Sequence, residues 1–239
     1  MKNLILSVII SITSLTVFAS TNPVDSLQAK FDLATSDVVK AKLLTKMATS
    51  YMNYSALQDK QVKTDFQENA LKYTYQALHF YSRNDDSTGL RVCYDRLARV
   101  YRDQRKFTQA KWFILQANTM ARAQNDVPNI TKSLITLAGI KMDIKDFDLA
   151  ERDLGEALEL SSINRFSDQQ ADVMLGYSRL YKGLHRPVKA IAAEQRYSYI
   201  KDSMKRDSQS RIVKVVTKKK FFTVNNRESK NTTTASITL

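Results

Sequence analysis

Two stretches of the chain, forty residues apart, carry the same alternation of small and large apolar residues against a polar background. The first is RKFTQAKWFILQANTMA, from Arg105 to Ala121, and the second is KDFDLAERDLGEALELS, from Lys145 to Ser161. The positions that match are Phe107 with Phe147, Ala110 with Ala150, Ile114 with Leu154, and Ala117 with Ala157. A spacing of seven keeps the two alanines of each stretch on one helix face. The pattern therefore predicts helices that pack closely through their small residues, while the other positions face solvent or a partner.

The same pattern continues along the chain in both directions. Steps of forty from Ala110 reach Ala70 on one side and Ala190 on the other. A second small residue, such as Ala98, lies twelve positions before each later anchor, so each unit is expected to hold two helices. In the first unit the spacing from Ala48 to Ala70 is 22, which indicates a ten-residue insertion within NYSALQDKQVKTDFQ. The alanines expected to be buried between helices are Ala48, Ala70, Ala77, Ala98, Ala110, Ala117, Ala138, Ala150 and Ala157.

Two helices in every forty residues are typical of an α-solenoid. The pattern Leu-Ala/Gly-x-x-Tyr, followed by Ala-x-x-x-large-x-x-Ala, resembles the tetratricopeptide repeat. The resemblance implies an all-α, right-handed solenoid of about four helix pairs, with a leading half-repeat from Val24 to Ala34. No unit has the Trp or the closing Pro of the full pattern, and Lys141 stands in place of a Tyr. Glu194 and Tyr197 replace an apolar and a small residue, so a loosely stacked last unit is expected.

Turn-forming residues separate the units in SRNDDSTG, AQNDVP and SINRFSDQ. After these turns, Ser87, Asp126 and Asp168 are expected to start the next helices, because short polar side chains cap helix N-termini. The two ends of the array carry a closer resemblance. VDSLQAKFDLATSDVVKAKLLTKMATSYM and YSYIKDSMKRDSQSRIVKV are similar to the exported sensor regions of bacterial repeat-containing histidine kinases and helix-turn-helix regulators. That resemblance implies an exported sensor or scaffold module, and it does not imply kinase activity.

The first twenty residues, MKNLILSVIISITSLTVFAS, have one basic residue, an apolar run and small residues at the end. This order is typical of a secretory signal peptide, and Val17 and Ala19 suit cleavage after Ala19. The alternative is an uncleaved anchor, although the run of about 16 residues is shorter than the roughly 20 that a spanning helix needs. The sequence therefore favours an exported protein in the periplasm or cell envelope of a Gram-negative bacterium.

Composition agrees with a helical chain, since 239 residues contain only 5 Gly and 3 Pro, and Cys93 is the single cysteine. A lone cysteine cannot form an intramolecular disulfide, and its apolar neighbours predict a buried, inert thiol. The formal net charge is +13. Ten basic and three acidic residues lie from Lys201 onward, so the basic character belongs mainly to the tail.

Candidate chemistry is sparse in this sequence. The two histidines, His79 and His185, lie over a hundred residues apart, and neither has a neighbour at metal-ligand spacing. The motifs of metalloproteases, α/β-hydrolases, dinucleotide-binding proteins and P-loop proteins do not occur. Glu151, Asp153, Glu156 and Glu159 are expected on a solvated helix face, and Trp112 is expected to pack on the outer helix layer or a neighbouring unit. The sequence thus predicts neither an enzyme nor a cofactor or metal site.

In tetratricopeptide arrays the first helix of each pair lines a concave groove where partners bind. Here the groove positions carry mostly basic side chains, which favours an acidic or amphipathic protein segment as partner. The alternative is a generally solvated face. The residues expected to line the groove are Lys42, Asp95, Arg99, Arg102, Lys132, Arg179 and Lys182.

Two functions from different classes fit these features. The first is a non-enzymatic, exported scaffold that binds protein segments in its concave groove. The second is a truncated sensory module of a membrane-associated signalling receptor, which the exit sequence after Tyr197 suggests. Nucleic-acid binding would rest on charge alone, because the sequence shows no known nucleic-acid-binding module.

The tail offers one further hypothesis. Lys218, Lys219, Lys220, Phe221 and Phe222 could associate with an anionic membrane surface, since each basic residue near such a surface contributes about 1 kcal/mol. The alternative is a solvated helix end.

The expected segments are a signal peptide (1–19), a leading helix (20–35), a repeat domain (36–208, with units at about 37–86, 87–126, 127–166 and 167–205), and a basic helical extension with a disordered tail (209–239).

Overall fold

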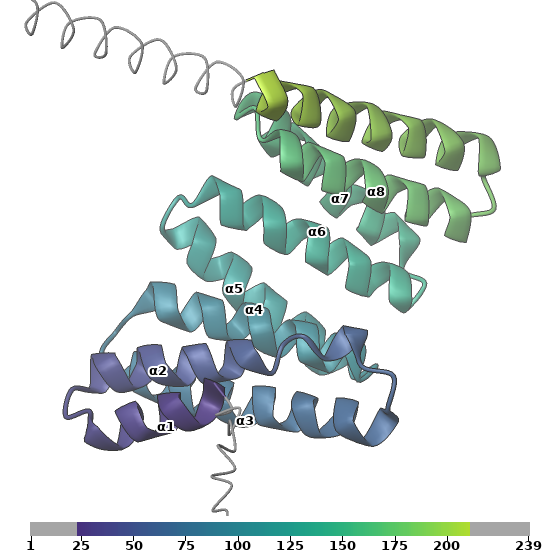
Figure 1. The fold of residues 1–239 in the computed structure, drawn as a ribbon. Coiled ribbons are helices and arrows are strands. Elements are labelled where there is room, and N and C mark those ends of the chain that lie inside the picture. Colours follow the sequence, from purple (N-terminus) through teal and green to yellow (C-terminus); the bar gives the residue numbers. More distant parts are fainter. Residues whose placement is uncertain (1–22, 211–239) are drawn as a thin grey trace, which may run out of the picture.

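The computed structural model of the chain describes residues 23–210, and every regular element in that range is a helix. The helices follow one another as an array, so the predicted all-α solenoid is confirmed (Figure 1). The elements are α1 (Pro23–Leu33), α2 (Asp37–Ser50), the 3₁₀ helix η1 (Tyr54–Ala56), α3 (Lys60–Arg83), α4 (Ser87–Asp103), α5 (Phe107–Ala123), α6 (Val127–Asp143), α7 (Phe147–Ile163) and α8 (Ser167–Gly183). A further helix over residues 187–210, named the exit helix below, follows α8.

The array is strictly periodic from α4 onward, because α4 to α8 each have 17 residues and their turns repeat every twenty. In each turn from the end of α3 to the start of the exit helix, one residue adopts a left-handed backbone conformation, and none of these residues is a glycine. The turn residues are Asp85, Arg105, Asn125, Lys145, Arg165 and His185. Each turn is closed by two hydrogen bonds, such as those from the N–H groups of Lys145 and Asp146 to the carbonyls of Met142 and Lys141. This Schellman arrangement satisfies carbonyls that the helix end leaves free.

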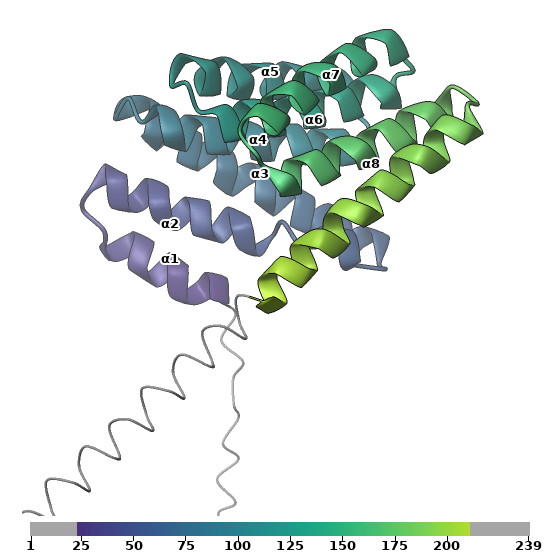
Figure 2. The ribbon, with the colours of Figure 1, turned by 90° about the horizontal axis from the view of Figure 1, so that it is seen from above.

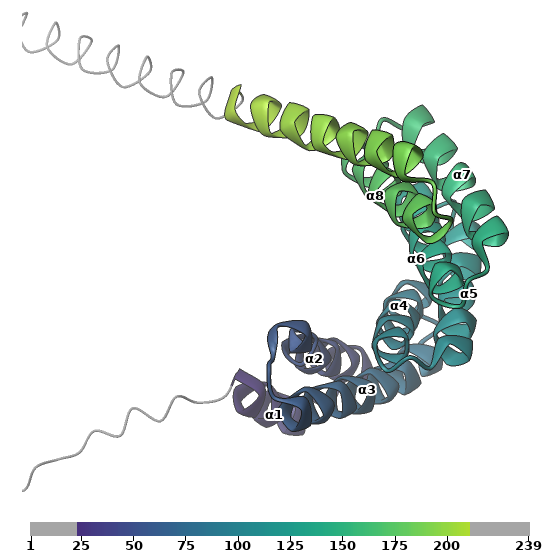
Figure 3. The same ribbon diagram turned by 90° about the vertical axis from the view of Figure 1, so that its right-hand side faces the viewer.

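The helices form two layers around an arc. Viewed along the helices, α2, α4, α6 and α8 line the inner side, while α3, α5 and α7 lie on the outer side (Figure 3). The exit helix extends from the far end of the arc past α8, and α1 covers the opposite end (Figure 2). The inner helices of successive units are neighbours, so side chains from α4, α6 and α8 can meet on the concave face.

All nine alanines that the sequence places between helices are buried, each at most 1% exposed. They sit in hydrophobic clusters that follow one another along the array. In one such cluster, Ala138 of α6 and Ala150 of α7 pack with Leu154 and with Leu180 of α8. Small residues allow this close approach because a larger side chain would push the backbones apart. The prediction that the repeated positions are interhelical contacts is therefore confirmed.

The extra residues of the first unit lengthen α3 to 24 residues and form η1 before it. Tyr54 of η1 is 1% exposed, and its hydroxyl donates to a carboxylate oxygen of Asp103 at 2.8 Å. Burial, reinforced by this hydrogen bond, raises the pKa of the Tyr54 phenol. At the other end of this unit, Val24 and Phe31 of α1 belong to the cluster formed by α2, α3 and α4.

Helix starts differ slightly from the sequence prediction. Asp126 caps α6 as predicted, with its carboxylate accepting from the N–H of Asn129. The cap of α4 is Asp86, one residue before Ser87, and its carboxylate accepts from the N–H of Gly89. α8 begins at Ser167, one residue before Asp168, after an N-cap residue without a side-chain hydrogen bond. The regular twenty-residue spacing thus fixes these starts more strongly than the local capping residues do.

One expectation about a single side chain is wrong. Asp153 does not lie on a solvated face, because it is 5% exposed and pairs with Lys141 of α6 at 2.6 Å. Trp112 lies on the outer helix α5, where it is 53% exposed and packs at nearly right angles against the rings of Phe113 and Tyr94. Cys93 is fully buried as predicted, and burial raises the pKa of its thiol to about 12.

The expected signal peptide and most of the basic tail, including Lys218 to Phe222, lie outside the described residues. Within residues 23–210, no helix combines the length and apolar character required to cross a membrane.

Candidate functional site

The concave face is the candidate site, because α4, α6 and α8 bring charged side chains together there. Of the seven residues expected to line it, Arg102, Asp95 and Lys132 come from adjacent inner helices and interact electrostatically with neighbours across the groove. Lys42 lies on α2 and is exposed. The structure therefore places the predicted residues on the inner helices, but it gives them different roles.

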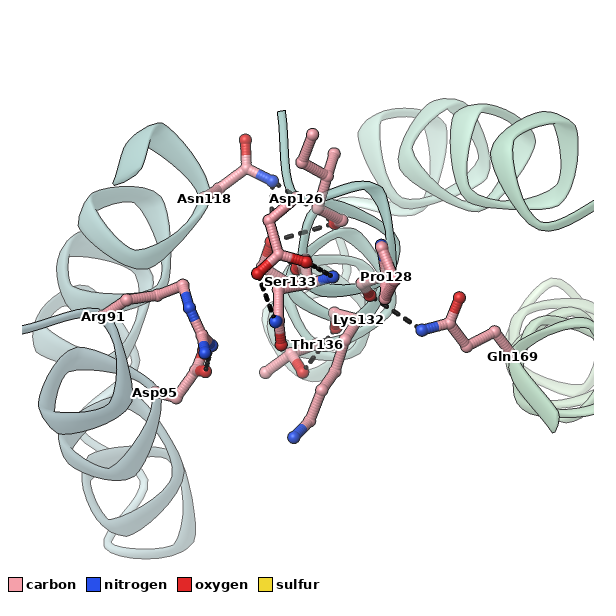
Figure 4. A network of polar contacts seen from close by, with 11 residues as sticks. Arg91, Asp95, Asn118, Asp126, Pro128, Lys132, Ser133, Thr136 and Gln169 are labelled. Carbon is pink, nitrogen blue, oxygen red and sulfur yellow. Dashed lines mark hydrogen bonds and ion pairs between the residues drawn. The ribbon is translucent and has the colours of Figure 1, made fainter. Parts of the chain in front are cut away.

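Asp95 of α4 is committed to the fold rather than free for a partner. The guanidinium of Arg91, one turn earlier, is buried and donates to the Asp95 carboxylate at 3.0 Å (Figure 4). Burial raises the pKa of Asp95, and the positive charge of Arg91 is the strongest influence opposing that rise. Lys132 of α6 also faces this carboxylate electrostatically, yet its ammonium makes no hydrogen bond or ion pair within the described residues (Figure 4).

A polar cleft of about 570 Å³ lies where the C-terminal ends of α4 and α6 meet α8. Asp143, the last residue of α6, sits between two arginines: Arg102 of α4 donates to one carboxylate oxygen at 2.6 Å, and Arg179 of α8 approaches the other at 3.3 Å. A single carboxylate thus joins three inner helices. Because two guanidinium groups share it, the cleft keeps an excess of positive charge. The residues that line the cleft are Arg102, Asp103, Arg105, Phe107, Asp143 and Arg179.

Gly139 makes room for this arrangement. A Cβ atom at Gly139 would stand 2.7 Å from both terminal nitrogens of Arg102, so the guanidinium lies directly over the bare backbone of α6. Position 139 corresponds to Arg99 one unit earlier. Replacing an arginine by a glycine at this repeat position therefore lets Arg102 reach across to Asp143.

Lys182 makes an ion pair with the exit helix. Its ammonium lies 3.0 Å from the carboxylate of Glu194 on the exit helix, and a second pair joins Lys201 of that helix to Asp168 of α8 at 3.1 Å. Both pairs are exposed and link the exit helix to α8 only weakly, whereas Ala190 and Ala193 of the exit helix are buried. The basic side chains of the predicted set that keep no ion pair within the described residues are Lys42, Arg99 and Lys132.

Several groove residues were missed by sequence reasoning. Arg96 ties α4 to α2 by donating to the carbonyl of Thr45 at 2.9 Å and to the hydroxyl of Thr49 at 2.6 Å. Asp143 was missed although Asp103 stands forty residues before it, and this repetition of an acidic residue at the end of an inner helix is the signal that could have found it. Arg105 lies in a turn, and nothing in the helical pattern indicates that it borders the cleft.

Within residues 23–210, no group of three or more His, Cys, Asp or Glu side chains gathers in a way that could hold a metal ion. The chemistry that this face offers is recognition of negative charge by guanidinium and ammonium groups, which bind carboxylates through charge-assisted hydrogen bonds.

Comparison with known proteins supports the fold. No family model and no curated protein sequence matches the chain. Its structure is similar to that of aspartyl phosphate phosphatase F from Bacillus subtilis, with a TM-score of 0.65 and 16% identity over 76% of this chain and 45% of that one. It is also similar to BtubC (BKLC) from P. vanneervenii, with a TM-score of 0.53 and 15% identity over 76% of this chain and 88% of that one. The chain spans less than half the length of the phosphatase, and at these identities the likeness shows a tetratricopeptide-like helical-repeat fold.

Proposed function

We propose that the chain is a non-enzymatic, exported scaffold that binds an acidic segment of a partner protein along its concave groove. The observation that carries this proposal is the set of uncommitted cations on the inner helices. Arg99 of α4 and Lys132 of α6 form no ion pair within the described residues, although both act electrostatically on the Asp95 carboxylate. Arg102 and Arg179 line the cleft at the C-terminal ends of the inner helices.

The shape of the array supports an extended occupant rather than a small molecule. The inner helices follow one another along the arc (Figure 3). Arg99, Lys132 and Arg179 come from three of these helices, so one extended partner segment can meet several basic residues in turn. Exposed charges at an interface raise the association rate and give specificity, and they are screened by salt. Binding should therefore weaken as the ionic strength rises.

A fluorescence-anisotropy titration tests the groove with a defined probe, a fluorescein-labelled peptide of alternating glutamate and alanine. The Arg99→Glu/Lys132→Glu variant should weaken binding by at least about tenfold, because two repulsive contacts replace two attractive ones. The matched control is Lys72→Glu/Lys111→Glu, which changes the same number of charges on the outer helices α3 and α5. If the groove variant and the control bind the probe equally, the groove is not the acidic-segment site.

Export has its own test. Cleavage after Ala19 predicts that protein purified from the producing cells begins at Ser20. Mass spectrometry of the intact chain would reveal this start, and recovery of a chain that still carries residues 1–19 would contradict the expected cleavage.

A sensory module of a membrane-associated receptor is the second candidate. The observation that favours it is the exit helix, which runs from residue 187 to the last described residue and forms two exposed ion pairs with α8. A rigid helix of this kind can transmit a change in the array to a following segment. Sequencing the genomic region downstream decides between the candidates: a membrane span and signalling domain in a shifted frame would support the receptor, and an unrelated intact gene would oppose it.

A further inference from the structure

One position on the second helix of a unit packs against the first helix of that unit, and the residue at this position changes along the array. In the second unit Phe113 fills it and stacks on Tyr101, with ring centroids 5.4 Å apart and planes 7° from parallel. Forty residues later the corresponding pair is Asp153 and Lys141, which fills the place with a buried ion pair. Another forty residues later the pair is Ala193 and Tyr181.

The alanine leaves this place open in the last unit. An open cleft of about 390 Å³ lies between α7, α8 and the exit helix. Its floor contains Tyr177 and Tyr181, whose rings stack 5.8 Å apart and are only partly buried. Apolar cavities of about 150 Å³ already accept a benzene ring. The residues that line the cleft are Leu158, Met174, Tyr177, Tyr181, Lys189, Ala192, Ala193 and Arg196.

The charged residues that line the cleft are both basic. Lys189 and Arg196 belong to its lining, and neither makes an ion pair within the described residues. The ammonium of Lys189 lies 5.5 Å from the centre of the Tyr181 ring. No carboxylate lines the cleft, although Glu151 lies nearby and accepts a long hydrogen bond of 3.4 Å from the Tyr181 hydroxyl. An occupant with negative charge next to its apolar group would therefore complement the rim.

We propose that this cleft is a docking site for an aromatic side chain on a partner segment with acidic residues beside it. The aromatic ring would take the place that Phe113 occupies in the second unit, and the acidic neighbours would meet Lys189 and Arg196. The cleft shares no lining residue with the polar cleft at the ends of α4 and α6.

The chain itself carries another candidate occupant, since Phe221 and Phe222 follow Lys218, Lys219 and Lys220 in the sequence. Three lysines next to the aromatic residues would be repelled by Lys189 and Arg196, and this charge mismatch favours a separate acidic partner. The experiment below distinguishes the two occupants.

Isothermal titration of the full chain with the peptide acetyl-Glu-Glu-Phe-Glu-Glu-amide tests the site, with the same peptide carrying Ala in place of Phe as a comparison. The Phe peptide should bind at least about tenfold more tightly than the Ala peptide, because burial of a large aromatic ring contributes at least the free energy of a tenfold change in affinity. Ala193→Phe should fill the cleft, reduce binding of the Phe peptide by at least about tenfold and raise the melting temperature.

Charge variants keep the test decisive if Ala193→Phe fails to fold. Lys189→Glu/Arg196→Glu should weaken binding by at least about tenfold, while Lys205→Glu/Arg206→Glu, exposed on the same helix away from the cleft, should change it less than about twofold. Equal binding of the two peptides, or undiminished binding to a folded Ala193→Phe variant, would overturn the site. If Phe221→Ala/Phe222→Ala tightens binding more than about threefold, the tail competes for the cleft and the partner assignment is wrong.

Discussion

The buried ion pair between Lys141 and Asp153 allows a sharp test of the packing between α6 and α7. The ammonium and the carboxylate are 2.6 Å apart, and their side chains are only 5% and 7% exposed. Removing one partner leaves the other charge buried without compensation. We therefore expect Asp153→Ala to lower the free energy of unfolding by about 3–5 kcal/mol.

A second ion pair, whose acidic residue also lies on α7, provides the matched control. Arg122 of α5 and Glu156 of α7 also form an ion pair, but their side chains are 45% and 42% exposed. Water and dissolved ions screen such a pair, so Glu156→Ala should cost only about 0–1 kcal/mol. The large difference between the two alanine variants is the expected signature of burial.

The double variant Lys141→Met/Asp153→Leu completes the test. It removes both charges and fills their place with apolar side chains, so its stability should equal that of the original chain or exceed it by about 1–4 kcal/mol. Two opposite results, a large loss in Asp153→Ala and no loss in the double variant, would show that desolvation of the charges governs this site.

Urea unfolding followed by circular dichroism at 222 nm measures these differences without the screening that a guanidinium salt would add. The slope of the unfolding free energy against urea concentration should be compared between variants, because arrays of repeats can lose cooperativity when a central unit weakens. If Asp153→Ala costs no more than Glu156→Ala, the pair is not buried as described and the reasoning is refuted.

Three further outcomes follow from the structure. Ala150→Leu should lower the free energy of unfolding by about 1–3 kcal/mol through overpacking, and a thermal melt equal to that of the original chain would contradict the interhelical position of Ala150. Lys145→Gly and Arg165→Gly, at left-handed turn positions, should each raise stability by about 0.5–1 kcal/mol in urea titrations, whereas Arg152→Gly within α7 should lower it by about 1 kcal/mol. Burial raises the pKa of Cys93 from 9.0 to about 12, so the unfolded state ionises first and the folded state loses stability as the pH rises above 9. Melting temperatures from pH 8 to 11 should fall more steeply for the original chain than for Cys93→Ala, and parallel curves would contradict this account.

The sequence by itself determined the class of fold and its period. Small residues recur at fixed steps because two helices can approach closely only where neither has a bulky side chain, and this requirement is visible without coordinates. For that reason the burial of Ala110 and Ala150 could be predicted. The sequence also placed Arg99 and Lys132 on the inner helices, since the repeat assigns each position to one side of the array.

The tertiary structure decided which charged residues are free and which are already paired. Asp153 is a charged residue of a kind usually found at the surface. Only the packing of α7 on α6 places it opposite Lys141. Lys182 has the same charge as Lys132, yet Lys182 lies 3.0 Å from the carboxylate of Glu194 on the exit helix, whereas Lys132 forms no ion pair within the described residues. Long charged side chains reach neighbours on other helices, and the distance to those neighbours depends on how the array is stacked. The periodic pattern fixes the small residues that hold the helices together, whereas the pairing of charges depends on distances between residues far apart in the chain.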